Sequence, residues 1–337
     1  MSAARNWLQP VLAIAAALAV SALLLLALGA DPVRALSALG RGAFGDRIAI
    51  ENTLLRMVPL VLIGLAVALS FRCGVWNIGG EGQLYLGALA ATAVATRGFS
   101  EGGSAAALPL ALIAGVAAGA AWAGLAGLLR VMRGVSEVLS TLLLNFIAIL
   151  AVAWAVQGPL QEASGAYPQS DAFAAVARLP MLPGFARVHA GLLLALALPA
   201  AIWILLFRSA AGLRLRAVGL SPDAARYAGI SPARETLSVM AIAGALAGLA
   251  GAIEVAGVTG RLFQNLSPGY GFTAIAVALL ARLHPIAVLP GALFFAALAS
   301  GSGAMQRIAG IPSVTVLLIE ALVILFSAGF ALPRSSR

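Results

Sequence analysis

The sequence predicts an all-α protein that crosses a membrane many times, and three features support this fold class. Of the 337 residues 62% are hydrophobic and only 10% are charged, and the mean hydropathy is +1.02. A water-soluble domain cannot bury that much apolar surface, so lipid must cover part of it. Backbone in lipid has to satisfy its own hydrogen bonds, which leaves helices or a closed barrel. The apolar runs are continuous rather than alternating, and they therefore predict helices.

Each membrane-spanning helix needs about 20 apolar residues. On that basis we predict about ten helices within a single transmembrane domain that covers residues 1–337. Segments 83–97 and 272–281 are short, and short segments are typical of broken helices beside a transport path. The first segment has an apolar core too long for a signal peptide, so we expect it to remain as a span. The predicted segments are 8–29, 53–71, 83–97, 108–129, 137–157, 188–207, 236–257, 272–281, 285–300 and 313–330.

All 21 basic residues are arginine, and their distribution predicts the orientation. With an even number of spans both termini lie on one side, and most arginines then fall in the loops on that side. Basic loops face the cytoplasm, so we expect a multi-pass protein of the bacterial inner membrane with cytoplasmic termini. The net charge of +9 follows from the same rule and does not predict nucleic-acid binding.

Several kinds of chemistry are unlikely on composition alone. Without any lysine the chain has no ordinary P-loop and no Schiff-base residue. Cys73 is the only cysteine, and His189 and His284 are far apart in the sequence, so we expect no metal site and no cofactor. Ser/His dyads and paired Asp residues are absent from the centres of the spans, which argues against an intramembrane enzyme.

A glycine-rich polar stretch at residues 75–83 separates two apolar spans. Irregular backbone at membrane depth is tolerated only inside protein or beside a water-filled cavity. We therefore predict a re-entrant segment that lines a pathway, although a simple cytoplasmic loop is an alternative. The side chains expected in the pathway are Trp76, Asn77, Glu81 and Gln83.

A second polar group lies within the predicted span 137–157. Glu137, Thr141 and Asn145 are spaced four residues apart and therefore share one helix face. Because polar groups are costly in lipid, this face must turn inward. It is either a polar stripe in the channel or a set of hydrogen bonds between helices.

Three further features single out residues. The aromatic residues Phe263, Tyr270 and Phe272, with Trp76, could stack on a ring or be ordinary interfacial aromatics. Two acids, Glu254 and Glu320, lie deep in apolar spans and are candidates for function or for a structural hydrogen bond. The pairs Gly115/Gly119 and Gly244/Gly248 have the GxxxG spacing that allows close helix contact.

The cytoplasmic segment 208–235 contains a short helix with clear start and stop signals. Ser221 is placed as the N-cap, with Pro222 in the first position and Asp223 in the first turn. Gly229 ends the helix, and Arg226 and Tyr227 project from it. A capped helix in a cytoplasmic loop is suited to docking, while a solvated surface helix is the alternative.

Four motifs in order resemble those of ABC permeases for nucleosides and simple sugars, within the larger group of ribose and branched-chain amino acid permeases. Residues 77–83 (Asn-Ile-Gly-Gly-Glu-Gly-Gln) and 137–145 are two of them, although Ser136 stands where Asn is usual. The run 216–230 is similar to the coupling segment of that family. Residues 271–280 match a fourth block, with Ala281 where Gly is usual.

The resemblance implies a type II-like importer permease that forms half of a translocation pathway for a nucleoside or simple sugar. It also implies a second permease subunit that is a paralogue, together with two ABC ATPase subunits and a periplasmic or lipoprotein substrate-binding protein. ATP hydrolysis would then occur on the partner chains, and Ser221, Asp223, Arg226, Tyr227 and Gly229 would contact them. A branched-chain amino acid permease and an ion-coupled secondary transporter remain as alternatives.

Overall fold

The computed structural model describes residues 2–27, 29–97, 104–312 and 314–331, with side chains for residues 12–326 of these ranges. These parts are helical, and the only strand-like pairings among them are two isolated bridges. The α-helices are α1 (Ser2–Ala27), α2 (Pro32–Phe44), α3 (Arg47–Arg72), α4 (Gly80–Arg97), α5 (Ala107–Arg133), α6 (Glu137–Gln157), α7 (Gly191–Arg208), α8 (Ala210–Leu220), α9 (Pro222–Tyr227), α10 (Pro232–Ile253), α11 (Tyr270–Leu280), α12 (Val288–Ala309) and α13 (Val314–Ala331). Short turns of other helix types are η1 (Ala175–Ala177), the π-helix η2 (Glu254–Thr259) and η3 (Pro285–Ala287).

The prediction of an all-α membrane protein is confirmed. Each of the ten predicted segments overlaps one helix, and the short segment 272–281 is the half-length helix α11. Within the described residues six helical segments are long and apolar enough to cross a membrane: Arg47–Arg72, Ala107–Arg133, Glu137–Gln157, Gly191–Arg208, Pro232–Thr259 and Pro285–Ala309. Shorter apolar helices cover Leu12–Ala27, Tyr270–Leu280 and Val314–Phe326.

Two helices were not expected from the sequence. The predicted outer loop 30–52 contains α2, which begins after the Asp31 side chain accepts hydrogen bonds from the amides of Val33 and Arg34. The segment 208–235 contains α8 in addition to the predicted short helix. Both helices, of 13 and 11 residues, are too short to be found as apolar runs of membrane-spanning length.

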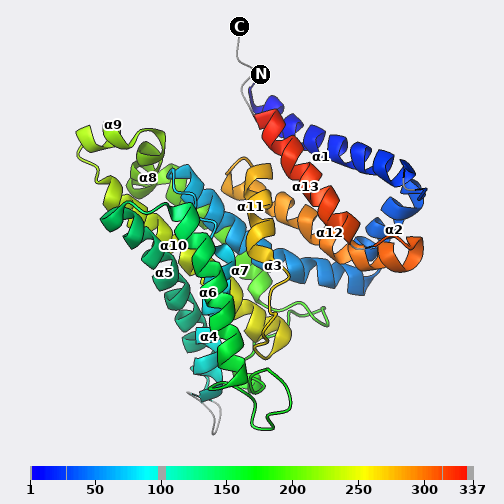
Figure 1. The fold of residues 1–337 in the computed structure, drawn as a ribbon, viewed down its shortest axis with the longest axis horizontal. Helices are drawn as coiled ribbons and strands as arrows, with labels where there is room; N and C mark the ends of the chain where they lie inside the picture. Colours follow the sequence, from blue (N-terminus) through cyan, green and yellow to red (C-terminus); the bar gives the residue numbers. More distant parts are fainter. Residues whose placement is uncertain (1, 28, 98–103, 313, 332–337) are drawn as a thin grey trace.

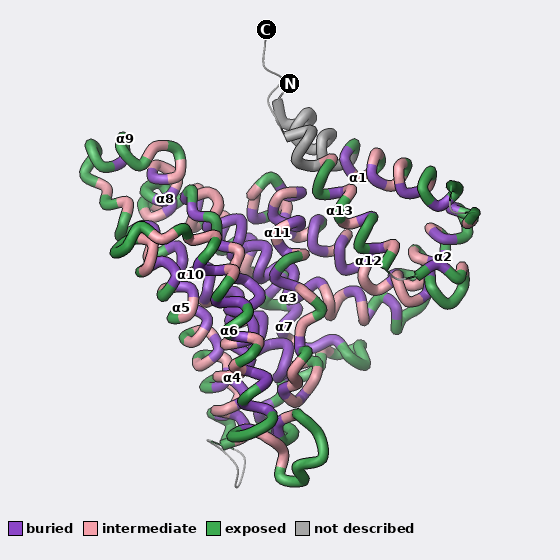
Figure 2. The backbone as a smooth tube through the Cα atoms, viewed as in Figure 1, coloured by how far each residue is buried: buried purple, intermediate pink, exposed green. Residues whose placement is uncertain are grey.

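Figure 1 shows the helices in two groups, with α4 to α10 on one side and α1, α2, α12 and α13 on the other. The N-terminal end of α1 and the C-terminal end of α13 lie at the same end of the molecule as α9 (Figure 1). Figure 2 shows buried residues concentrated along α3 and α10. In α3 and in α10 with its continuation η2, 78% of the most apolar stretch of residues is buried, whereas in α5 only 28% is. The helices α3 and α10 are therefore central, and α5 presents its outer face to lipid.

The helices α5 and α10 touch through their backbones. A Cβ added to Gly119 would lie 2.7 Å from the Gly248 Cα, and one added to Gly248 would lie 2.9 Å from the Gly119 Cα. Gly115 and Gly244 lie in the same seam. The predicted close contact at the two GxxxG pairs is thus confirmed, and the two motifs pack against each other. In lipid this kind of packing, rather than hydrophobic exclusion, holds helices together.

We expect Gly119→Ala to destabilise the protein, because the added methyl group would press on backbone that has no room to move. Overpacking of this kind costs about 1–3 kcal/mol, which should lower the melting temperature measured in detergent. Gly124→Ala, on the same helix, is the matched control because a Cβ there meets nothing within 4 Å. Equal melting temperatures for the two variants would contradict the close packing of α5 and α10.

Candidate translocation site

The motif at residues 75–83 is a short non-helical link followed by the first turn of α4. Gly74 turns the chain at φ +73°, after which the Asn77 side chain closes the link on itself. Its Oδ1 accepts hydrogen bonds from the Gly79 amide and from the Gln83 Nε2, both at 2.9 Å. Asn77 and Gln83 are each only 1% exposed, so both side chains act inside the protein.

The polar face of α6 lies directly against this link. Asn145 donates to the Ile78 carbonyl at 2.9 Å and accepts from the Gly82 amide at 2.8 Å. Thr141 accepts from the Ile78 amide at 3.3 Å. The two polar features predicted separately from the sequence are therefore one unit, in which side chains of α6 satisfy backbone groups that a helix would have satisfied internally.

Glu137, the first residue of α6, holds one end of this unit. Its carboxylate accepts from the Trp76 amide at 3.2 Å and forms an ion pair with Arg130 at the end of α5. The Trp76 side chain is 54% exposed, and its ring lies 4.7 Å from that of Phe71. Hydrogen bonding between helices, one of the two alternatives for the α6 stripe, is what these contacts provide. A role for the stripe in the pathway remains a prediction.

Glu81 connects α4 to the half-length helix α11. Its Oε2 accepts from the Gly271 amide at 2.6 Å, although the two residues are 190 positions apart. The Ser267 hydroxyl accepts from the amides of Gly269 and Tyr270 at 3.1 and 3.0 Å. Together these groups satisfy the free amides at the start of α11, where the helix dipole places partial positive charge. The close approach needs glycine, because a Cβ on Gly271 would lie 2.6 Å from the Glu81 Cα.

We expect Glu81→Leu to destabilise the protein much more than Glu81→Gln. A glutamine keeps an oxygen that can accept from the Gly271 amide, whereas leucine leaves that buried amide without a partner at a cost of about 1–3 kcal/mol. Melting temperatures in detergent measure the difference. If leucine and glutamine lower the melting temperature equally, the carboxylate does not act as a cap.

A polar cavity of about 560 Å³ lies beside the start of α11. Loop 260–269 forms one wall, and α3, η2, α11 and α12 contribute the others. A volume of this size suits a small solute. The lining residues are Asn52, Leu55, Arg56, Glu254, Val258, Asn265, Leu266, Ser267, Pro268, Tyr270 and Ser300.

A second, smaller cavity of about 210 Å³ adjoins the first one. Both are lined by Arg56, Pro268 and Tyr270, and the smaller cavity reaches Glu320 on α13. The two intramembrane acids that the sequence singled out thus lie on two neighbouring cavities. Glu254 occupies the first position of the π-helix that continues α10.

Of the aromatic residues predicted for the pathway, Tyr270 lines both cavities. Phe263 pairs with Gln169 in an isolated bridge, and Phe272 is 45% exposed; neither lines these two cavities. The sequence analysis missed Arg56, Asn52, Asn265 and Ser300. Arg56 did carry a signal, because it is a charge within the predicted span 53–71.

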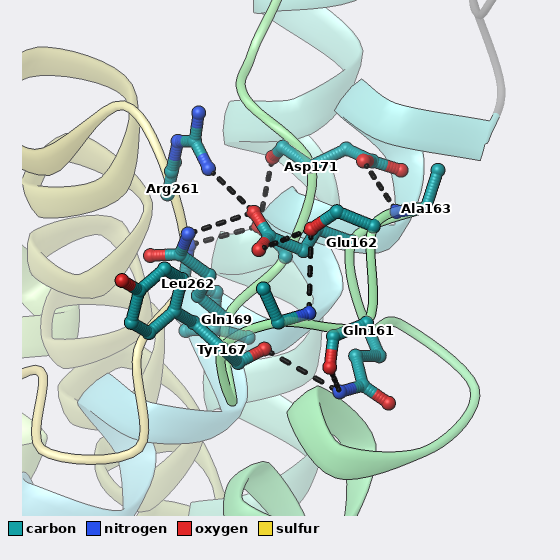
Figure 3. Close-up of polar contacts among 12 residues, drawn as sticks. Gln161, Glu162, Ala163, Tyr167, Gln169, Asp171, Arg261 and Leu262 are labelled. Carbon is teal, nitrogen blue, oxygen red and sulfur yellow. Dashed lines mark hydrogen bonds and ion pairs between the residues drawn. The ribbon is translucent and has the colours of Figure 1, made fainter.

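The long loop 158–190 is attached to the cavity wall by backbone and side-chain contacts. Ser170 donates its amide to the Leu262 carbonyl at 3.0 Å, and Phe173 donates to Gly260 at 2.9 Å. Glu162 accepts from Arg261 at 2.8 Å and from Gln169 at 2.7 Å (Figure 3). This loop therefore sits on the chain segment that leads into residues 265–268 of the cavity.

Glu162 gives this attachment a defined pH dependence. Hydrogen bonds from Ser164 and Gln169, and the charge of Arg261, hold the pKa of the Glu162 carboxyl below its usual value of 4.5. A carboxyl whose pKa is lowered on folding stabilises the folded state above the unfolded pKa, and this contribution is lost as the pH falls through the folded pKa. We therefore expect the loop to stay attached down to about pH 4.5 and to loosen only below it.

A nitroxide at Ala166, introduced as cysteine in a Cys73→Ser background, reports the loosening as increased mobility in its electron paramagnetic resonance spectrum. Glu162→Gln is the control, because its label mobility should not change with pH over this range. Loosening of the wild-type loop already between about pH 6 and 5 would contradict the lowered pKa.

The helix α9 has the predicted caps. The Ser221 hydroxyl accepts from the Ala224 amide at 3.2 Å, Pro222 and Asp223 occupy the first turn, and Gly229 has φ +79°. Tyr227 is 94% exposed, and Leu220, the last residue of α8, is 88% exposed. Arg226 forms an ion pair with Asp223 at 3.1 Å on the surface. The helix thus presents an apolar and a basic side chain outward.

The helix α8 rests directly on the end of α3. A Cβ on Gly219 would lie 2.9 Å from the Arg72 carbonyl carbon and 3.1 Å from that of Cys73. Arg72 donates to the Leu283 carbonyl at 2.6 Å, and the guanidinium groups of Arg72 and Arg216 both lie over the Phe207 ring, at 5.1 and 5.2 Å. The helix α8 therefore contacts the residues that lead into the 75–83 link.

Comparison with known proteins adds the family. Residues 49–327 match the family described as "Branched-chain amino acid transport system / permease component". The chain is a permease of this ABC transporter family. The match covers both the 75–83 link and α9 and leaves out α1 and α2. An ABC permease is a transport subunit and not an enzyme.

Three curated relatives of the permease are similar over nearly the whole chain. A glucose ABC transporter permease protein of Haloferax volcanii is 42% identical over 94% of this chain and 86% of its own. A guanosine ABC transporter permease protein of Bacillus subtilis is 36% identical over 95% and 92%. A nucleoside ABC transporter permease protein of Lactococcus lactis is 32% identical over 96% and 91%.

Proposed function

We propose that this permease forms half of the translocation pathway of an ABC importer for a nucleoside or a simple sugar. The observation that carries the proposal is the polar cavity at the start of α11, bounded by a buried acid, an arginine and several uncharged polar side chains. The names of the three relatives support the substrate class. An ion-coupled secondary transporter is no longer needed to explain the intramembrane acids, because the family relies on ATPase subunits.

The partners follow from the same proposal. The permease would pair with a second permease subunit, two ABC ATPase subunits and a periplasmic or lipoprotein substrate-binding protein. Two curated relatives, 30% identical to this chain, support a paralogous second subunit. They are a second guanosine permease protein of Bacillus subtilis and a putative glucose permease protein of Haloferax volcanii, and each comes from an organism that also has one of the relatives above. The shared end of α1, α13 and α9 in Figure 1 supports cytoplasmic termini in the inner membrane.

Within the pathway the predicted residues would have two kinds of role. Tyr270 lines the cavity, and Glu81 holds the helix that carries Tyr270. Asn77, Gln83, Glu137, Thr141 and Asn145 would keep the non-helical link rigid beside the pathway. Trp76, Phe263 and Phe272 are partly exposed and would line it at other levels.

The coupling segment 208–235 would contact the ATPase subunit through α9. Arg226 can pair with a carboxylate on the ATPase, and Tyr227 can fill an apolar pocket beside it. Motion would then pass from α9 to α8 and through Gly219 to the end of α3. The 75–83 link, which includes the Glu81 cap, lies next along that route. A displacement of this link would therefore reach the cavity wall.

The test is uptake by the complete transporter in proteoliposomes. The wild-type complex should accumulate a nucleoside or sugar with ATP inside, and an uncoupler should not prevent it. We expect Arg226→Glu to abolish both uptake and substrate-stimulated ATP hydrolysis, because it replaces the outward basic group with an acid. Gly229→Val should act similarly, because valine disfavours the left-handed conformation by about 1–2 kcal/mol.

Gly310→Val is the matched control for backbone strain. Gly310 also ends a helix at positive φ, +68°, a Cβ there meets nothing within 4 Å, and it belongs to the outer side on the proposed orientation. Ala225 is only 3% exposed and is therefore unsuitable as a surface control on α9. Normal uptake by both α9 variants would show that α9 does not couple the ATPase to the permease.

A further inference from the structure

The larger cavity contains three polar groups that the described protein leaves available for hydrogen bonding. The Glu254 side chain is 6% exposed and lines the cavity, yet within the described residues it has neither a hydrogen bond nor an ion pair through its carboxylate. Arg56 faces the same cavity and likewise makes no such contact among those residues. The Ser300 hydroxyl is buried without a partner. Buried groups of this kind are costly unless something bonds to them.

These groups differ in what they can bond. A carboxylate only accepts hydrogen bonds and a guanidinium only donates them, whereas a serine hydroxyl does both. A solute that satisfies all three must therefore carry donors and acceptors close together. Adjacent hydroxyls on a sugar ring have this property, because each can donate to a carboxylate and accept from a guanidinium at once.

The charge of the site favours a neutral solute. Glu254 and Arg56 place an acidic and a basic side chain in one cavity, so neither a cation nor an anion meets a site of purely opposite charge. Asn52, Asn265 and Ser267 extend the hydrogen-bonding surface, and the Tyr270 ring supplies an apolar wall. A carboxylate, carboxamides, hydroxyls and one aromatic ring together suit a polyhydroxylated ring.

The local backbone also marks this position. Glu254 opens the only π-helix among the described residues, and it directly continues α10. Such π-turns occur frequently at functional sites. The widened turn extends from a helix that α5 holds rigidly, so the carboxylate is supported by a fixed element.

We propose that Glu254, Arg56 and Ser300 recognise the ring hydroxyls of a neutral, polyhydroxylated solute, the part that a ribonucleoside and a sugar share. This inference rests on the proposed function and assigns substrate selection to residues of the permease itself. A branched-chain amino acid could pair with the acid and the base, but its aliphatic side chain would leave the Ser300 hydroxyl without a partner.

The test compares substrates with and without ring hydroxyls, and it does so for the wild type and for variants that lack the Glu254 carboxylate or the Ser300 hydroxyl. Uptake efficiency is measured for a ribonucleoside and its 2′,3′-dideoxy analogue, or for glucose and a deoxyglucose, with the complete transporter. The same binding protein serves every variant, so its own preference cancels when variants are compared. We expect Glu254→Gln to reduce the preference for the hydroxylated substrate about tenfold to a hundredfold, the range for hydrogen bonds to a charged group.

Ser300→Ala removes one oxygen without changing any charge, and it should reduce the same preference about threefold to tenfold. Glu320→Gln is the matched control, because it makes the same substitution at an intramembrane acid outside this cavity. It should leave the preference unchanged. If Glu254→Gln transports nothing, Ser300→Ala decides the case by itself.

The outcomes separate the two proposals. A wild-type transporter that imports leucine but neither a nucleoside nor a sugar overturns the proposed function. If the wild type imports a nucleoside or sugar and Ser300→Ala keeps the full hydroxyl preference, the assignment of this cavity is wrong while the proposed function stands. An equal loss of preference in Glu320→Gln and Glu254→Gln also overturns the assignment, because the effect would then belong to any intramembrane acid.

Discussion

The contact between Glu81 and the start of α11 is the interaction on which the interior of this permease depends. A half-length helix that begins inside a membrane protein has free amides and no water to bond them. The Glu81 carboxylate and the Ser267 hydroxyl supply the missing acceptors. Because Glu81 belongs to the first turn of α4, the same contact fixes two broken elements relative to each other. It therefore fixes where α11 begins relative to α4.

The polar residues of α6 likewise supply hydrogen-bond partners to the backbone of the link before α4. The link is not helical, and Thr141 and Asn145 bond its amides and carbonyl directly. Glycine at positions 79 and 82 allows that approach, since a Cβ on Gly82 would lie 2.8 Å from the Asn145 Cα. Polar side chains and glycines that look like two separate signals in the sequence are therefore a single structural requirement, and they hold the backbone on which the cavity is built.

Much of the fold was predictable, because hydropathy and caps are local properties of the sequence. The ten apolar segments and the α9 caps at Ser221 and Gly229 belong to this class. The helix α2 was missed because, with 13 residues, it is too short to stand out among apolar runs of membrane-spanning length. The pairing of Glu81 with Gly271 and the grouping of Arg56 with Ser300 were not predictable, since both join residues far apart in the chain. The intramembrane acids Glu254 and Glu320 and the aromatic Tyr270 marked the cavities in advance, and the charge of Arg56 within a predicted span gave the same kind of signal.

The backbone contact between α5 and α10 joins these two helices into one closely packed unit. Two helices that touch at glycine have no side chains that could change rotamer, so they can neither slide nor rotate without collision. Their shared seam therefore behaves as one solid body, and it carries Glu254 with it. Ser300 belongs to α12, which lies in the other group of helices (Figure 1). A motion that swings α12 and α13 away from the α5–α10 body would widen the gap between the Glu254 carboxylate and the Ser300 hydroxyl, and it would then also release whatever those two groups hold.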